Sequence, residues 1–82
     1  MDAYYLAGIG PAGQTPPTAY ESAERARRAV VSALEDLAEE YPDYATTIDK
    51  VLARFTEDPD VGNYLEYFEV AGREHALFFG PM

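Results

Sequence analysis

The last third of the chain contains two aromatic segments separated by a short turn, and this arrangement limits the folds that the chain can adopt. Residues 63–70 and 73–79 are rich in aromatic and β-branched side chains, which pack well on a pleated surface. Ala71 and Gly72 lie between them and suit a two-residue hairpin turn. We therefore predict an antiparallel hairpin with strands at 63–70 and 73–79.

Both faces of this hairpin are apolar. With a two-residue turn, one face carries Tyr64, Phe68, Val70, Leu77 and Phe79. The other face carries Leu65, Tyr67, Ala76 and Phe78. A longer or bulged turn would shift the register and bury more of these groups. With the two-residue turn, helices can cover only one face, and we expect an aromatic patch to remain for a homodimer mate or a target protein.

One strand and two amphipathic helices precede the hairpin. Residues 3–9 predict a strand that ends in a glycine-rich loop. A capping-box pattern begins at Thr18, and apolar residues then recur at steps of three and four, so we predict a helix over 18–40. Pro42 ends this helix, and a second apolar stripe predicts a helix over 43–57.

These elements predict an α+β fold in the order strand, helix, helix, strand, strand. The simplest arrangement is a small three-stranded, mostly antiparallel sheet with two helices on one face. The 82 residues suffice for one compact core and no second one. We therefore predict a single domain over residues 1–82.

The charge of the chain restricts its partners. Fifteen acidic residues against six basic ones give a formal net charge of −9. Such a field repels nucleic acid and anionic membranes and attracts basic proteins, including those whose positive grooves hold nucleic acid. The absence of cysteine excludes disulfides and thiolate chemistry and favours the reducing cytoplasm. We expect a protein partner with a basic nucleic-acid-binding surface, and no direct contact with nucleic acid or membrane.

Acidic residues gather at the end of the first predicted helix. The opening turns carry Glu21 and Glu24 four residues before Arg25 and Arg28, a favourable orientation for ion pairs. The closing turns and the exit carry only acids, which we call the acidic ridge: Glu35, Asp36, Glu39, Glu40 and Asp43. Like charges four residues apart at the negative end of a helix cost roughly some tenths of a kcal/mol per pair. The ridge is either a solvated face or a surface that meets a basic partner.

No motif in the sequence predicts catalysis or cofactor binding. The GIGPAG pattern at residues 8–13 matches a dinucleotide-binding fingerprint superficially, but Pro16 and Pro17 hold the helix start too far from the third glycine. His75 is the only histidine, and we expect it to face solvent or an interface rather than to bind a metal. We predict no catalytic, cofactor-binding or metal-binding residues.

In size, acidity and lack of chemical motifs, the chain is similar to phage-encoded anti-CRISPR and anti-restriction inhibitors. The resemblance implies an inhibitor or decoy in which acids imitate nucleic acid and aromatic side chains supply contact energy. The expected contact residues are Glu35, Asp36, Glu39, Glu40, Asp43, Tyr64, Tyr67, Phe68 and Phe78. One alternative is a homodimeric, antitoxin-like regulatory or accessory subunit whose acids only solubilise it. A second is a small enzyme or ligand-binding domain with a tyrosine-lined pocket.

Overall fold

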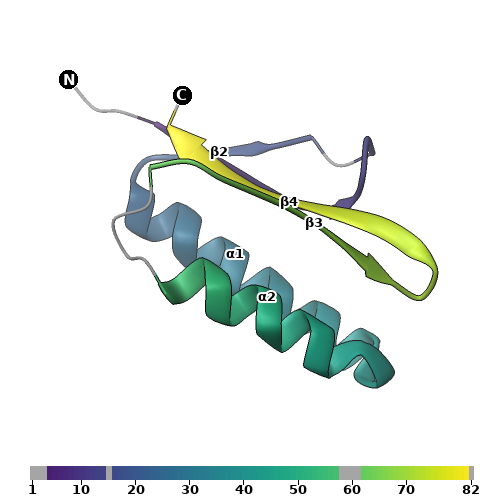
Figure 1. Ribbon diagram of the computed structural model, residues 1–82. Helices are drawn as coiled ribbons and strands as arrows, with labels where there is room; N and C mark the ends of the chain where they lie inside the picture. Colours follow the sequence, from purple (N-terminus) through teal and green to yellow (C-terminus); the bar gives the residue numbers. More distant parts are fainter. Residues whose placement is uncertain (1–3, 15, 58–61, 82) are drawn as a thin grey trace.

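The computed structural model of the protein describes residues 4–14, 16–57 and 62–81 and has two layers, a four-stranded antiparallel sheet and a pair of helices on one of its faces (Figure 1). The elements follow in the order β1 (Tyr5–Pro11), β2 (Thr18–Tyr20), α1 (Ala23–Glu40), the 3-10 turn η1 (Pro42–Tyr44), α2 (Ala45–Glu57), β3 (Tyr64–Val70) and β4 (Arg73–Pro81). The strand order is β2-β1-β4-β3, so β2 and β3 are the outer strands. The predicted α+β class is confirmed.

The sheet has one strand more than we predicted. Thr18, expected to begin the first helix, lies in β2 and pairs with Ala7 of β1. The helix begins later because Ser22 caps it: the Ser22 hydroxyl accepts a hydrogen bond from the backbone N–H of Arg25 at 3.2 Å. The backbone of Thr18–Tyr20 pairs with β1, so Thr18 does not cap the helix, and Ser22 caps it instead.

The other elements lie close to their predicted positions. The strand expected at 3–9 is found at Tyr5–Pro11, and residues 1–3 lie outside the described residues. The second helix begins at Ala45, because the preceding residues form the turn η1. The last strand continues through Pro81.

The hairpin turn has the predicted length. Val70 pairs directly with Arg73, so only Ala71 and Gly72 form the turn. Both have positive φ, 54° at Ala71 and 77° at Gly72, as in a type I′ turn, whose twist matches that of the flanking strands. The register, and with it the division of side chains between two faces, is therefore as predicted.

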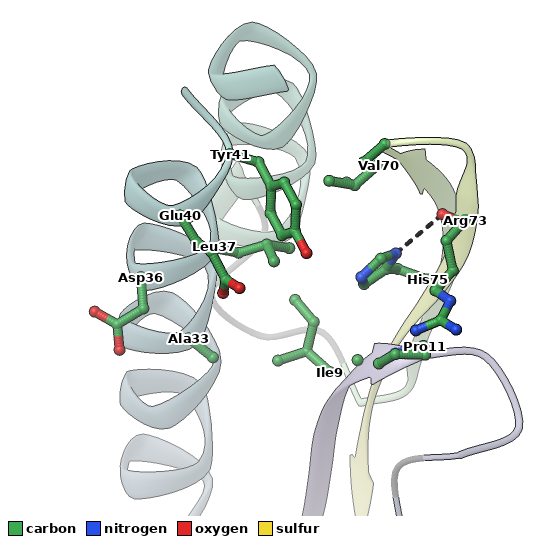
Figure 2. Close-up of a pocket in the computed structure, with 12 residues that line it drawn as sticks. Ile9, Pro11, Ala33, Asp36, Leu37, Glu40, Tyr41, Val70, Arg73 and His75 are labelled. Atoms are coloured by element: carbon green, nitrogen blue, oxygen red, sulfur yellow. Dashed lines mark hydrogen bonds between the residues drawn. The ribbon is translucent and has the colours of Figure 1, made fainter. Parts of the chain in front are cut away.

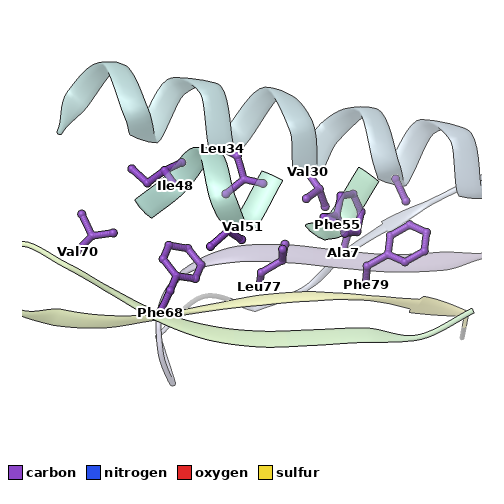
Figure 3. Packing of buried hydrophobic residues seen from close by; sticks show 11 residues of the cluster. Ala7, Val30, Leu34, Ile48, Val51, Phe55, Phe68, Val70, Leu77 and Phe79 are labelled. Atoms are coloured by element: carbon purple, nitrogen blue, oxygen red, sulfur yellow. The ribbon is translucent and has the colours of Figure 1, made fainter. Parts of the chain in front are cut away.

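The hydrophobic core lies between the helices and the sheet (Figure 3). Phe55 of α2 is fully buried in this core, and its ring contacts the rings of Tyr64 and Phe79 edge to face, with centroids 5.3 and 5.4 Å apart. Arg27 of α1 places its guanidinium over the Phe55 ring, 4.9 Å from the centroid, and donates to the Phe55 carbonyl at 3.3 Å. This contact ties α1 to the C-terminal end of α2, where a positive charge is favourable.

Candidate functional site

The face of the sheet that points away from the helices is the first candidate surface, and we call it the open face. Leu65 and Tyr67 of β3 and Phe78 of β4 are exposed there, at 58%, 57% and 36% of their full accessible area. Both helices lie on the other side of the sheet (Figure 1). These side chains alternate with buried ones, so strand periodicity itself puts them in solvent.

The exposed side chains form one patch because their strands are neighbours. Leu65 lies directly opposite Phe78, and Tyr67 lies opposite Ala76. On the other side of β4, Phe78 is opposite Gly8, which has no side chain to cover the ring. A hollow of about 220 Å³, lined by Phe78, Ala76 and Pro17 among others, extends the patch over β1. The glycines of residues 8–13 thus help to line this apolar hollow.

Two carboxylates border the open face at the hairpin end. Glu69 of β3 and Glu74 of β4 are both exposed and lie directly opposite each other. Like charges in this position destabilise a strand pair. Sequence reasoning missed this pair, although the predicted two-residue turn already placed the two residues opposite one another.

The acidic ridge is exposed and carries uncompensated charge. Its five residues, Glu35, Asp36, Glu39, Glu40 and Asp43, lie on α1 and η1. In the part of the chain that the structure describes, no salt bridge involves them, whereas the predicted pairs Glu21–Arg25 and Glu24–Arg28 are present. The ridge belongs to the helical layer and the open face to the opposite side of the sheet (Figure 1). One flat partner surface cannot contact both.

The four aromatic residues predicted as contacts are divided between the two faces of the sheet. Tyr67 and Phe78 lie on the open face. Tyr64 and Phe68 lie on the helical side, where Phe68 retains 8% of its accessible area and Tyr64 packs against Phe55. Leu65, absent from the predicted contacts, is the most exposed large apolar side chain among the described residues.

A polar network on the helical side connects α2 to β3. Glu66 accepts hydrogen bonds from the Arg54 guanidinium, with Nε at 3.2 Å, and from the Tyr64 hydroxyl. Burial, reinforced by the neighbouring carboxylate, raises the pKa of Tyr64 to about 12. Burial alone would raise the pKa of Glu66, but the hydrogen bonds from Arg54 and Tyr64 outweigh it and lower the pKa. This network stabilises the fold, because it holds charges in pairs near the core.

His75 is buried, contrary to our expectation that it faces solvent or an interface. It retains 5% of its accessible area, and its ring stacks on that of Phe68 with centroids 5.8 Å apart. Its position in β4 puts it on the helical side, in register with Phe68. Among the described residues, no group of three or more histidine, aspartate or glutamate side chains is arranged to hold a metal ion.

Neither helix of the described chain combines the length and the apolar composition needed to cross a membrane. No model of a protein family, no curated protein and no solved structure gives a significant match to this chain.

Proposed function

We propose that the protein is a protein-binding module that docks through its open face on a partner whose apolar surface is edged with basic side chains. The observation that carries this proposal is the exposure of Leu65, Tyr67 and Phe78 as one patch on the uncovered side of the sheet. A contiguous apolar patch with a polar rim is the usual anatomy of a binding surface.

Tyr67 is the central residue of the proposed interface. Its ring is rigid and more than half exposed, and its hydroxyl tolerates water before the partner arrives. Truncation of a central tyrosine at an interface typically costs about 2 kcal/mol or more, which weakens binding about thirtyfold. Phe78 and Leu65, directly opposite each other, extend the apolar contact beside it.

Charge supports a basic partner over a second copy of the chain. Each copy carries a net charge of −9, and Glu69 and Glu74 border the open face. Two such faces repel one another, whereas a basic rim is complementary. Proteins that handle nucleic acid carry such basic surfaces, so on this proposal the protein acts in the cytoplasm as an inhibitor or decoy that occupies one of them. The acidic ridge lies on the opposite side of the molecule, so on this proposal it attracts the basic partner only through its long-range electrostatic field.

The test measures binding to a purified partner. A basic protein retained by the immobilised chain from native cell extract is purified and titrated against the wild type and against Tyr67→Thr and Leu65→Thr, which keep the strand preference for β-branched residues. Ala53→Ser, on the exposed surface of α2, is the control. We expect the open-face variants to lose at least about tenfold in affinity and the control to match the wild type.

Charge is tested with a second pair of variants. Glu69→Gln with Glu74→Gln should slow association and flatten its dependence on salt, while Asp49→Asn with Glu57→Gln, the same charge change on α2, should do so less. Full affinity in Tyr67→Thr and Leu65→Thr would contradict the proposal.

The same apolar patch also supports the homodimer alternative. Light scattering on the pure protein distinguishes this alternative from binding to a different partner. If the pure wild-type protein is a dimer that Tyr67→Thr converts to monomer, the open face is a self-association surface and the proposed partner is wrong. A monomeric wild type with partner binding sensitive to Tyr67 supports the proposal.

A further inference from the structure

Two hollows of the structure differ in chemical character. The larger is a cleft of about 550 Å³ between the second half of α1 and the hairpin end of the sheet (Figure 2). Glu40 on one of its walls and Arg73 on the other carry opposite charges that balance, and the Asp36 carboxylate points away from the cleft (Figure 2). The smaller hollow, of about 220 Å³, lies on the open face beside Phe78. We call it the glycine hollow, and its chemistry restricts what it can bind.

The glycine hollow is lined without polar side chains. Three glycines line it together with Pro11, Pro17, Ala76 and Phe78. None of these side chains donates or accepts a hydrogen bond, so the part of a ligand that enters the hollow must be apolar. The volume is smaller than the roughly 300–1,000 Å³ of sites for whole small molecules. The hollow therefore suits one apolar side chain of a larger ligand.

Gly8 keeps this hollow open, although the fold does not require a glycine there. Its φ is not positive, unlike those of Gly13 and Gly72. A Cβ at Gly8 would have the Cα of Pro17 as its nearest atom, at 3.4 Å, which is an ordinary van der Waals contact. Glycine inside a strand weakens it relative to alanine and often marks a place where a ligand or another chain approaches closely. Because Gly8 lies directly opposite Phe78, a methyl group at Gly8 would narrow the hollow.

Carboxylates border the hollow at the hairpin end. Glu74 lies two residues before Ala76 on the same face of β4, which is about 7 Å along a strand. Glu69 lies opposite Glu74, and in the part of the chain that the structure describes neither takes part in a salt bridge. A positive group close to both would relieve their repulsion. A ligand with an apolar group in the hollow and a basic group about 7 Å away complements both features.

A polyproline II segment that carries a basic residue has this combination of groups. Its rings are apolar, and such segments dock on aromatic-lined surfaces because their backbone is already in the bound conformation. Phe78 borders the hollow, and Tyr67 lies opposite Ala76, so two exposed aromatic rings are available. A rise of about 3.1 Å per residue puts a side chain two or three residues from a bound proline roughly 6–9 Å away. This range includes the separation between the hollow and Glu74.

We propose that the open face recognises an extended, proline-rich segment of its partner. One proline ring enters the glycine hollow between Phe78 and Pro17, and an arginine or lysine two or three residues away lies against Glu69 and Glu74. Gly8 determines specificity, because a side chain at this position closes the hollow to a ring. The inference rests on the proposed function, since it names the element through which the partner docks.

The test titrates the full chain, labelled with ¹⁵N, with acetylated and amidated peptides while amide chemical shifts are followed. The peptide APPAPPRA should give saturable shifts at Gly8, Gly10 and Ala76, with a dissociation constant of about 0.1–1 mM, as for a short peptide with few anchors. The neutral analogue APPAPPAA should bind about tenfold more weakly. The analogue AALAALRA keeps the arginine and lacks the rings, and it should also bind about tenfold more weakly. The reversed sequence ARPPAPPA establishes the direction in which the segment runs.

Two glycines provide a matched pair of variants. A Cβ at Gly62 would meet no atom within 4 Å, its φ is not positive, and it does not line the hollow. Gly8→Ala should weaken the binding of APPAPPRA about tenfold and should melt no lower than the wild type, because alanine suits a strand better than glycine. Gly62→Ala should stay within about twofold of the wild-type affinity.

A second set of variants tests the carboxylates. Glu69→Gln with Glu74→Gln should lower the affinity for APPAPPRA to that for the neutral peptide. Asp49→Asn with Glu57→Gln makes the same change of net charge on α2 and should leave most of the difference between the two peptides in place. Dispersed amide spectra check that each variant is folded.

Three results would overturn the inference. The first is the absence of saturable shifts with both APPAPPRA and its reversed sequence. The second is equal affinity for AALAALRA, because the hollow would then accept any apolar side chain. The third is an equal loss in Gly8→Ala and Gly62→Ala. If any of these occurs while the purified partner still loses affinity in Tyr67→Thr, the proposed function stands and only the proline-rich segment is wrong.

Discussion

Ala71→Asn should stabilise the protein. Ala71 has a φ of 54°, in the left-handed region that costs a residue with a Cβ roughly 1–2 kcal/mol. Asparagine tolerates this region, and Asn-Gly is the preferred pair for a type I′ turn. Ala71 is exposed, so the new side chain displaces no core contact. We expect a gain of about 1 kcal/mol, because asparagine removes part of the cost without making the unfolded chain more flexible.

Thermal unfolding followed by circular dichroism measures this gain. For a domain of this size, about 1 kcal/mol corresponds to a rise in Tm of roughly 4–8 °C. Gly72→Ala is the converse control. A Cβ at Gly72 would meet no atom within 4 Å, so any loss of unfolding free energy comes from its φ of 77° alone. We expect this loss to be similar in size to the gain in Ala71→Asn. If Ala71→Asn melts at or below the wild-type temperature, the reasoning from backbone strain is wrong.

Three further predictions concern the interior. The pKa of Tyr64 is raised from 10 to about 12 in the folded state, so Tyr64 contributes stability that is fully present below pH 10 and is lost between pH 10 and 12. Denaturant midpoints should therefore fall less steeply over that window in Tyr64→Phe than in the wild type. The lowered pKa of Glu66 gives the opposite pH dependence of the unfolding free energy. Its contribution is present above about pH 4.5 and is lost as the pH falls through the folded pKa, so Glu66→Gln should show a shallower acid dependence of the unfolding free energy. Leu34→Ala, at a fully buried position, should cost about 2–5 kcal/mol of unfolding free energy. Leu65→Ala, at an exposed one, should cost under about 0.5 kcal/mol, and equal losses would contradict the assigned faces.

The hairpin could be predicted from sequence because its signal is local. Side chains alternate with a period of two, and a two-residue turn fixes which residues lie opposite each other. β2 could not be predicted in this way, since Thr18–Tyr20 is too short for an alternating pattern. Thr18 and Glu21 also matched a capping box, although Ser22 performs the capping.

The candidate surfaces were predicted less completely. The predicted register correctly placed Tyr67 and Phe78 on one face of the hairpin and Tyr64 and Phe68 on the other. The predicted contact residues nevertheless came from both faces. The role of these residues in binding stays a prediction. The cleft could not be predicted, because it forms only where α1 packs beside the hairpin end, far away in sequence. His75 is buried because its position in β4 puts it on the helical side of the sheet, in register with Phe68.

The position of β3 at the border of the sheet has a consequence for self-assembly. In the part of the chain that the structure describes, no strand lies beyond it, so its outward main-chain groups can template a strand from another molecule. Glu66 and Glu69 sit on this border strand, and carboxylates there discourage such growth as long as they are ionised. The acidity of the chain thus also protects it against polymerisation into extended sheets, and concentrated solutions kept at low pH lose this protection.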